Sequence, residues 1–101
     1  MKIAIASDGK EITSTISEKG GRASYYLIFE NGVLLEIFKN PFAVGGGGAG
    51  PSVAKVLKGK GISKVFGKKF GEKMISALQE RKVKFEETTF LTVKEVLETV
   101  F

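Results

Sequence analysis

The sequence contains no cysteine and no histidine, and these two absences exclude much catalytic and metal-binding chemistry. Without Cys the chain has no disulfide and no thiol nucleophile, and without Cys or His it has no zinc site of the usual kind. It also lacks the one side chain that normally titrates near neutral pH. We therefore expect a binding protein and not an enzyme.

Long hydrophobic runs are absent as well. The longest apolar runs are a handful of residues, far short of the roughly 20 that a membrane helix needs, and the start MKIAIAS has no secretory hydrophobic region. We expect a cytoplasmic protein. Its 101 residues are enough for one domain with a modest core and leave little room for a second, so we predict a single domain over residues 1–101.

The positive charge is concentrated in the middle of the chain. The net charge is +5, and residues 55–84 carry ten basic and two acidic side chains, whereas residues 1–54 are balanced. Such a zone attracts an anionic partner, and two classes of partner stay open. The first is a small anionic ligand. The second is a macromolecule, either nucleic acid or a protein, that binds to a basic surface. Four of these lysines are interpreted as the solvated faces of two helices: Lys55, Lys58, Lys73 and Lys82.

Apolar periodicity and turn signals predict alternating strands and helices. The pair Asn31-Gly32 is a strong hairpin signal between two β-rich runs, and Thr92 with Glu95 forms a capping box before the last helix. Pro51 fits the first position of a helix. Strands are expected at residues 2–7, on both sides of the hairpin turn, at 62–67 and at 83–87, with helices from Pro51 to about residue 59, from about Phe70 to Arg81, and after Thr92.

This order, β-β-β-α-β-α-β-α, predicts an α/β fold. We expect a single three-layer domain, in which a five-stranded mixed sheet has helices on both faces and the later crossovers are parallel and right-handed. Ligands of such folds bind at the carboxyl edge of the parallel strands. Three loops should meet there: Ser7-Asp8-Gly9, Asn40 to Gly50, and Gly67 to Gly71.

Helix amino ends at this edge predict an anion site, because their N–H groups and dipoles favour negative charge. The expected donors are the amides of Ala49, Gly50, Ser52, Val53, Phe70 and Gly71. The glycines before the first helix allow a ligand to approach the backbone. Lys68 and Lys69 precede a helix start, where a cation is unfavourable unless an anion lies between, and Gly20 and Gly21 permit unusual backbone beside Arg22.

Other readings of the same residues are weaker. Gly45, Gly47 and Gly50 fit G-x-G-x-x-G, but a dinucleotide fold places this pattern in a tight turn after its first strand, with an acid about 20 residues later. GKKFGEK lacks the Gly-Lys-Ser/Thr of a Walker A motif. Asp8 is the only Asp, and two-metal hydrolysis needs several converging carboxylates, so Asp8 is interpreted as a turn residue and nuclease activity is set aside.

Several stretches together resemble the dinitrogenase iron-molybdenum cofactor biosynthesis family. They are MKIAIASDG, GRASYYLIFENG, NPFAVGGGGAGPSVAKVLKGKGI and KVFGKKFGEKMISALQERKVKF. The most specific parts are Gly-Arg-Ala with the aromatic strand, Asn-Pro before the loop, and Gly-Gly-Ala-Gly entering the helix. The resemblance implies a ribonuclease H-like motif without nuclease chemistry, and a protein that binds or carries nitrogenase iron-sulfur or iron-molybdenum cluster precursors.

Such a cargo would have to be held here without His or Cys. Backbone amides, Arg22 and lysines would act on an anion, or an oligomer would share the surface. Partner proteins of cluster assembly follow from the resemblance. The predicted cofactor-binding residues are Arg22, Gly47, Gly48, Ala49, Gly50, Lys68 and Lys69.

Overall fold

The computed structural model describes residues 1–45 and 48–101, and its elements follow the predicted order. A short 3-10 helix, η1, is added between the first two strands. The elements are β1 (Lys2–Ser7), η1 (Gly20–Arg22), β2 (Tyr25–Glu30), β3 (Val33–Lys39), α1 (Ala49–Gly59), β4 (Lys64–Gly67), α2 (Glu72–Glu80), β5 (Lys84–Glu87) and α3 (Val93–Val100).

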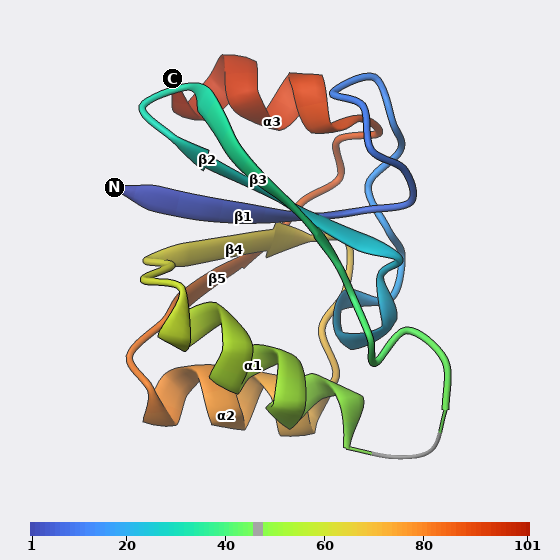
Figure 1. The fold of residues 1–101 in the computed structure, drawn as a ribbon, viewed down its shortest axis with the longest axis vertical. Coiled ribbons are helices and arrows are strands. Elements are labelled where there is room, and N and C mark those ends of the chain that lie inside the picture. The colour runs from blue at the N-terminus through green and yellow to red at the C-terminus, as the bar shows by residue number, and fades with distance from the viewer. Residues whose placement is uncertain (46–47) are drawn as a thin grey trace.

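The five strands form one mixed sheet in the order β3-β2-β1-β4-β5. Strands β1, β4 and β5 are parallel, while β2 runs antiparallel to both β1 and β3. This confirms the predicted α/β fold with a mixed sheet, and the single reversed strand agrees with the ribonuclease H-like motif. The carboxyl ends of β1, β4 and β5 share one edge of the sheet, on the right in Figure 1.

The hairpin turn has the geometry that its sequence predicts. Asn31 and Gly32 both adopt positive φ, 51° and 82°, as a type I′ turn requires. A positive φ is tolerated by Asn and is free of steric cost for Gly. The turn therefore joins β2 and β3 directly and defines the antiparallel half of the sheet.

Side chains alternate between two apolar layers along the central strands. Ala4, Ala6 and Tyr26 face the layer that α1 and α2 cover, and Ile3 and Ile5 face the layer that α3 covers. Figure 1 shows the three layers, with α3 on one side of the sheet and the α1–α2 pair on the other. Both faces of β1 are thus buried, as its continuous apolar run predicts.

Two helix starts differ from the prediction, and one agrees with it. Helix α1 begins at Ala49 after Gly48, whose φ is 87°, so Pro51 occupies the third helical position and not the first. Helix α2 begins at Glu72, two residues later than expected, because Phe70 packs into the core before the helix starts. The capping box of α3 at Thr92 is confirmed, with both of its hydrogen bonds present.

Within the described residues, no helix combines the length and the apolar character needed to span a membrane.

Candidate functional site

A hollow of about 330 Å³ lies at the carboxyl edge of the sheet, where η1 meets the starts of α1 and α2. We call it the carboxyl-edge hollow. The two helices are packed side by side, and their amino ends both open here (Figure 1). The residues that line it are Glu18, Lys19, Gly20, Gly21, Arg22, Gly48, Ala49, Gly50, Pro51, Lys69, Gly71, Lys73 and Met74.

The start of α1 supplies fewer amide donors than the sequence suggested. Because the helix begins two residues earlier, the Ser52 amide donates within the helix, to the Gly48 carbonyl oxygen at 3.1 Å. The Val53 amide lies beyond the first turn for the same reason. The amides of Ala49 and Gly50 hold the first two helical positions, whose N–H groups have no acceptor inside the helix. These two remain as donors toward a ligand.

The start of α2 is corrected in the same way. The Phe70 amide donates to Glu87 Oε2 at 2.9 Å, so a carboxylate already occupies the place that we expected for an anion. Glu87 ends β5, the strand parallel to β4, and this places its carboxylate beside the chain that leaves β4. The first helical residues of α2 are Glu72 and Lys73, and the second of these lines the hollow.

Three glycines allow the elements around the hollow to approach each other closely. A Cβ on Gly20 would lie 2.3 Å from the Phe70 ring, and one on Gly50 would lie 2.7 Å from the Met74 Cβ. A Cβ on Gly21 would lie 2.9 Å from the Gly50 Cα. Neither Gly20 nor Gly21 has a positive φ, so the expected unusual backbone beside Arg22 is wrong. These glycines are there for close packing.

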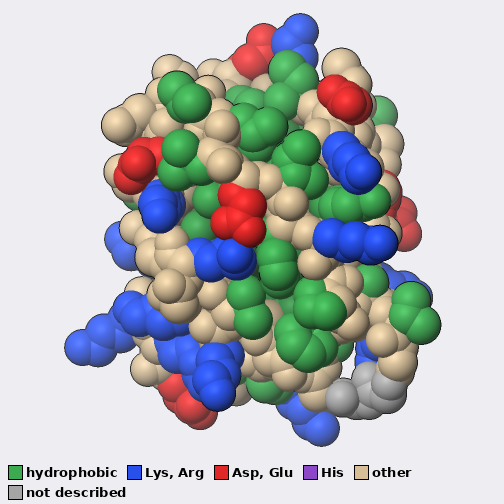
Figure 2. All heavy atoms as spheres, in the orientation of Figure 1, with side chains coloured by type: hydrophobic (Ala, Val, Ile, Leu, Met, Phe, Trp, Pro, Cys, Tyr) green, Lys and Arg blue, Asp and Glu red, His purple; other side chains and the backbone are tan. Residues whose placement is uncertain are grey.

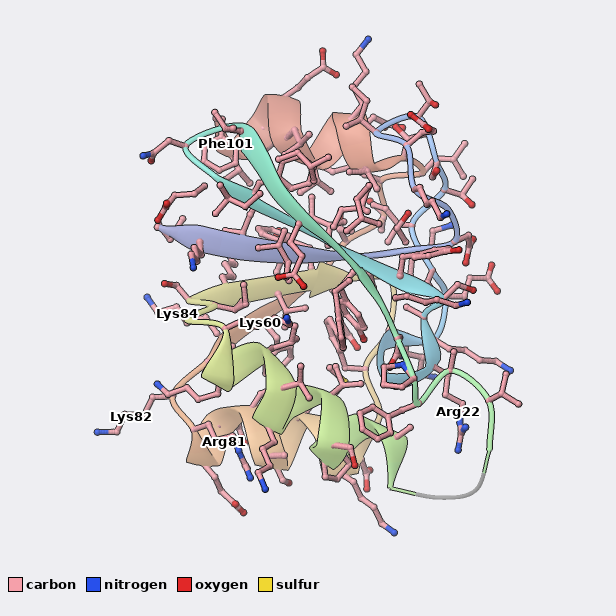
Figure 3. The ribbon with its side chains drawn as sticks, in the orientation of Figure 1. Arg22, Lys60, Arg81, Lys82, Lys84 and Phe101 are labelled. Atoms are coloured by element: carbon pink, nitrogen blue, oxygen red, sulfur yellow. The ribbon has the colours of Figure 1, made fainter. Side chains whose placement is uncertain are left out.

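Arg22 and Asn40 tie η1 to the long loop before α1. The Arg22 Nη1 donates to the Gly45 carbonyl oxygen at 3.0 Å, and Figure 3 shows this side chain lying inside the loop. Buried Asn40 donates from Nδ2 to the carbonyl oxygens of Gly21 and Ala23, at 3.1 and 2.9 Å, and its Oδ1 accepts from Phe42. Sequence reasoning missed the role of Asn40, although Asn-Pro is part of the family resemblance.

Cations outnumber acids around the hollow. Lys19, Arg22, Lys69 and Lys73 line it together with one acid, Glu18. Two helix amino ends add partial positive charge at the same place. The interpretation of Lys73 as part of a solvated face is therefore incomplete, because it also lines this hollow.

Lys68 lies apart from Lys69 and lines a second, adjoining hollow of about 460 Å³. The two hollows share Glu18, Lys19 and Arg22. Asp8 also lines the second hollow, and its Oδ2 accepts a hydrogen bond of 2.7 Å from the Thr15 hydroxyl. Its backbone N–H donates to the Thr15 carbonyl oxygen, which fits the interpretation of Asp8 as a turn residue.

The predicted site residues are thus brought together in part. Arg22, Gly48, Ala49, Gly50 and Lys69 line one hollow, Lys68 lines its neighbour, and Gly47 lies outside the described residues.

The side chains here do not offer a conventional metal centre. Over residues 1–45 and 48–101, no group of three or more Asp or Glu side chains is placed to hold a metal ion, and the sequence has no Cys or His. What the hollow offers is positive charge and backbone N–H groups. In proteins, groups of this kind bind anionic atoms and not a metal ion itself.

Comparisons with known proteins agree with this fold. The family model described as dinitrogenase iron-molybdenum cofactor matches residues 1–101. The apo form of the orange protein from Desulfovibrio gigas has a TM-score of 0.88 and 24% identity, over 96% of this chain and 83% of that one. A Thermotoga protein provisionally described as NifB has a TM-score of 0.82 and 29% identity, over 97% and 84%. No curated protein matches the chain.

Proposed function

The chain belongs to the dinitrogenase iron-molybdenum cofactor family, and we propose that it binds an anionic metallocluster, or a small anionic precursor of one, in the carboxyl-edge hollow. The observation that carries the proposal is the meeting of two helix amino ends with Lys19, Arg22, Lys69 and Lys73. The cluster is cargo and not a resident cofactor. The protein acts as a carrier or accessory protein and not as an enzyme.

The cargo is held through its surface atoms. The amides of Ala49 and Gly50, at the amino end of α1, donate to negatively charged atoms of the ligand. Lys69 and Lys73 supply ammonium groups on flexible side chains, which adjust to the ligand's shape. Arg22, already bonded to Gly45, couples the ligand to the loop before α1. Apolar atoms of Pro51 and Met74 complete the wall. No metal bond to a side chain is required.

Affinity should depend steeply on ligand charge. Each helix end contributes only about 0.3–1 kcal/mol toward an exposed charge, so a single monovalent anion binds weakly. A polyanion engages several donors at once and binds more tightly. Salt should weaken binding, because the screening length is about 10 Å at 0.1 M ionic strength.

The test is an amide NMR titration with sulfate, molybdate and tetrathiomolybdate, at low and high salt. We expect the shifts of the wild-type protein to centre on Ala49, Gly50 and Lys73. Lys69→Glu/Lys73→Glu should weaken tetrathiomolybdate binding at least about tenfold, because it reverses two of the four cations that line the hollow.

The matched control is Lys55→Glu/Lys94→Glu, which makes the same change of net charge on exposed helix positions outside the hollow. It should bind nearly as well as the parent. If both double variants lose affinity equally, the attraction is a property of net charge and the hollow is not a site. If no oxyanion or thioanion shifts the two helix starts, the proposal is wrong.

A further inference from the structure

Another concave surface lies at the opposite edge of the sheet, where the parallel strands begin. It is a recess of about 450 Å³, formed by the first residue, the end of α1 and the starts of β4 and β5. We call it the amino-edge recess. Figure 3 shows Lys82 and Lys84 at this end and Arg22 at the other, and Figure 2 shows the basic side chains gathered there. Its polar lining residues include Lys58, Ser63, Lys64, Lys82 and Lys84.

The recess is positively charged, and only part of its charge is compensated within the described residues. Among the residues that the structure describes, none that lines the recess is acidic. Lys64 Nζ pairs with Glu86 at 2.8 Å, but Lys58, Lys82 and Lys84 make no ion pair within the described part of the chain. The carboxyl end of α1 favours the nearby Lys58 through the helix dipole. The dipole does not account for Lys84, which begins a strand.

Backbone amides around the recess already donate to acceptors within the fold. The Gly61 amide donates to Lys58, the Ser63 amide to Lys2, and the Lys84 amide to Ser63, in each case to the carbonyl oxygen. The recess therefore presents flexible ammonium groups and hardly any fixed donors. A small anion is usually held by fixed amides that converge on it. Long flexible cations suit a wide, irregular array of carboxylates better.

Exposed apolar side chains continue this surface along the same edge. Strand pairing places Val33, Glu30 and Lys2 in one row across β3, β2 and β1. Lys64 pairs with Ile3, one residue further along β1, and with Lys84 on β5, so these two lysines lie next to that row and not in it. Met1 is 59% exposed and Val33 61%. Phe101 is 49% exposed and lies against Gly32, the residue before Val33. Figure 3 shows Phe101 at the same end of the sheet as Lys84.

The mixture of positive charge and exposed apolar side chains at this edge favours a protein partner over a nucleic acid. Five strands about 4.8 Å apart give the edge a width of about 20 Å, which is enough for a small protein contact. Protein interfaces combine apolar contacts with a polar rim, whereas the backbone of a nucleic acid offers phosphates and no match for exposed Val33 and Phe101. The Arg81 guanidinium, next to Lys82, is already engaged within the fold, since its Nη1 donates to the Ala77 carbonyl oxygen and lies 3.9 Å from Glu80 Oε2.

We propose that the amino edge, comprising the recess with Met1, Val33 and Phe101, is the docking surface for an acidic protein partner that also carries an exposed apolar group. The carboxyl-edge hollow stays open at the far end of the sheet when this surface is covered. This inference does not depend on the proposed cargo, because it uses different residues and a different edge.

The experiment uses three fluorescein-labelled probes of equal charge: a Glu-rich peptide containing a central Leu-Phe pair, the same peptide with Ser-Ser in its place, and a short DNA duplex. Anisotropy is measured at low salt for the wild-type protein, for Lys82→Glu/Lys84→Glu and for Val33→Ser. Lys10→Glu/Lys94→Glu is the control, since it makes the same charge change on exposed residues outside the recess. Circular dichroism confirms that each variant is folded.

We expect the Leu-Phe peptide to bind the wild-type protein more tightly than either other probe. Lys82→Glu/Lys84→Glu should weaken it at least about tenfold, Val33→Ser about threefold, and the control by less than about twofold. Tighter binding of the duplex would instead make the amino edge a nucleic-acid surface and overturn the proposal. Equal loss in both charge-reversed variants, or no binding of the Leu-Phe peptide, would overturn it as well.

Discussion

The hydroxyl group of Tyr26 provides a sharp test of the core. Tyr26 is 0% exposed, lies in the layer between the sheet and the α1–α2 pair, and its ring stands 6.5 Å from that of Phe38. Its hydroxyl has no hydrogen-bond partner among the described residues. Leaving a buried polar group unpaired costs about 1–3 kcal/mol. Tyr26→Phe keeps the ring and should raise the free energy of unfolding by about 1 kcal/mol at neutral pH.

The same environment makes stability depend on alkaline pH. Burial raises the pKa of the Tyr26 phenol well above its usual value near 10, since it disfavours the phenolate. Below pH about 10 the proton is bound in both states and the group adds no pH dependence. Above it, the unfolded chain loses the proton while the folded protein keeps it, so the free energy of unfolding falls by about 1.4 kcal/mol per pH unit.

Urea unfolding followed by circular dichroism measures both effects. The wild-type protein and Tyr26→Phe are compared between pH 7 and pH about 11.5, where the variant's advantage should have grown by about a further 2 kcal/mol. All other ionisable groups are the same in the two proteins, so the difference between the two curves removes their contribution. A variant less stable than the parent by about 1 kcal/mol at neutral pH would show that the hydroxyl has a partner, and the argument would fail.

Three further predictions concern packing, the loop clamp and metal content. Gly50→Ala should destabilise the folded protein by more than about 1 kcal/mol, because the added Cβ would press on Met74. Gly59→Ala in the same helix is the control, since its Cβ would meet nothing within 4 Å and should leave stability unchanged or raise it slightly. Thermal unfolding measures both variants. Asn40→Asp should cost about 2–4 kcal/mol in urea unfolding, since two carbonyl acceptors lose their donor and a charge is buried. Elemental analysis of the protein purified alone should find no stoichiometric zinc or iron, and a tightly held metal would contradict the surface-contact mode of binding.

Features whose cause is local were predictable from the sequence. Asn31-Gly32 sets its own turn geometry, and Thr92 with Glu95 closes a capping box within four residues. The mixed sheet with parallel later strands was predicted from the hairpin and the right-handed crossovers, whereas the order of its strands was not part of the prediction. The meeting of two helix starts at one edge follows from the same topology, so the general position of the hollow was predictable as well.

Features that depend on contacts between distant segments were not predictable from the sequence. The start of α1 depends on the left-handed Gly48 and on the space that Gly50 leaves for Met74. The loss of the Phe70 donor depends on the register of β5 beside β4, which brings Glu87 to that amide. The helix and strand propensities of the residues predict neither the start of α1 nor the contact between Phe70 and Glu87. For the same reason Lys73, which lies in the first turn of α2, was not recognised as part of the hollow together with Lys69, which precedes that helix.

The parallel topology gives cations opposite effects at the two edges, and this leads to a last prediction. Helix carboxyl ends favour Lys58 at the amino edge, whereas Lys73 stands in the first turn of α2, where the dipole opposes it. A lysine at this position lowers the stability of the free protein. Its presence there has a functional reason if an anion, when it binds in the hollow, offsets the lysine's charge. Lys73→Glu should therefore stabilise the free protein by about 0.5 kcal/mol in urea unfolding and reduce the stabilisation that tetrathiomolybdate gives the parent. If Lys73→Glu lowers the stability of the free protein, Lys73 serves the fold, and the charge at the carboxyl edge loses its functional explanation.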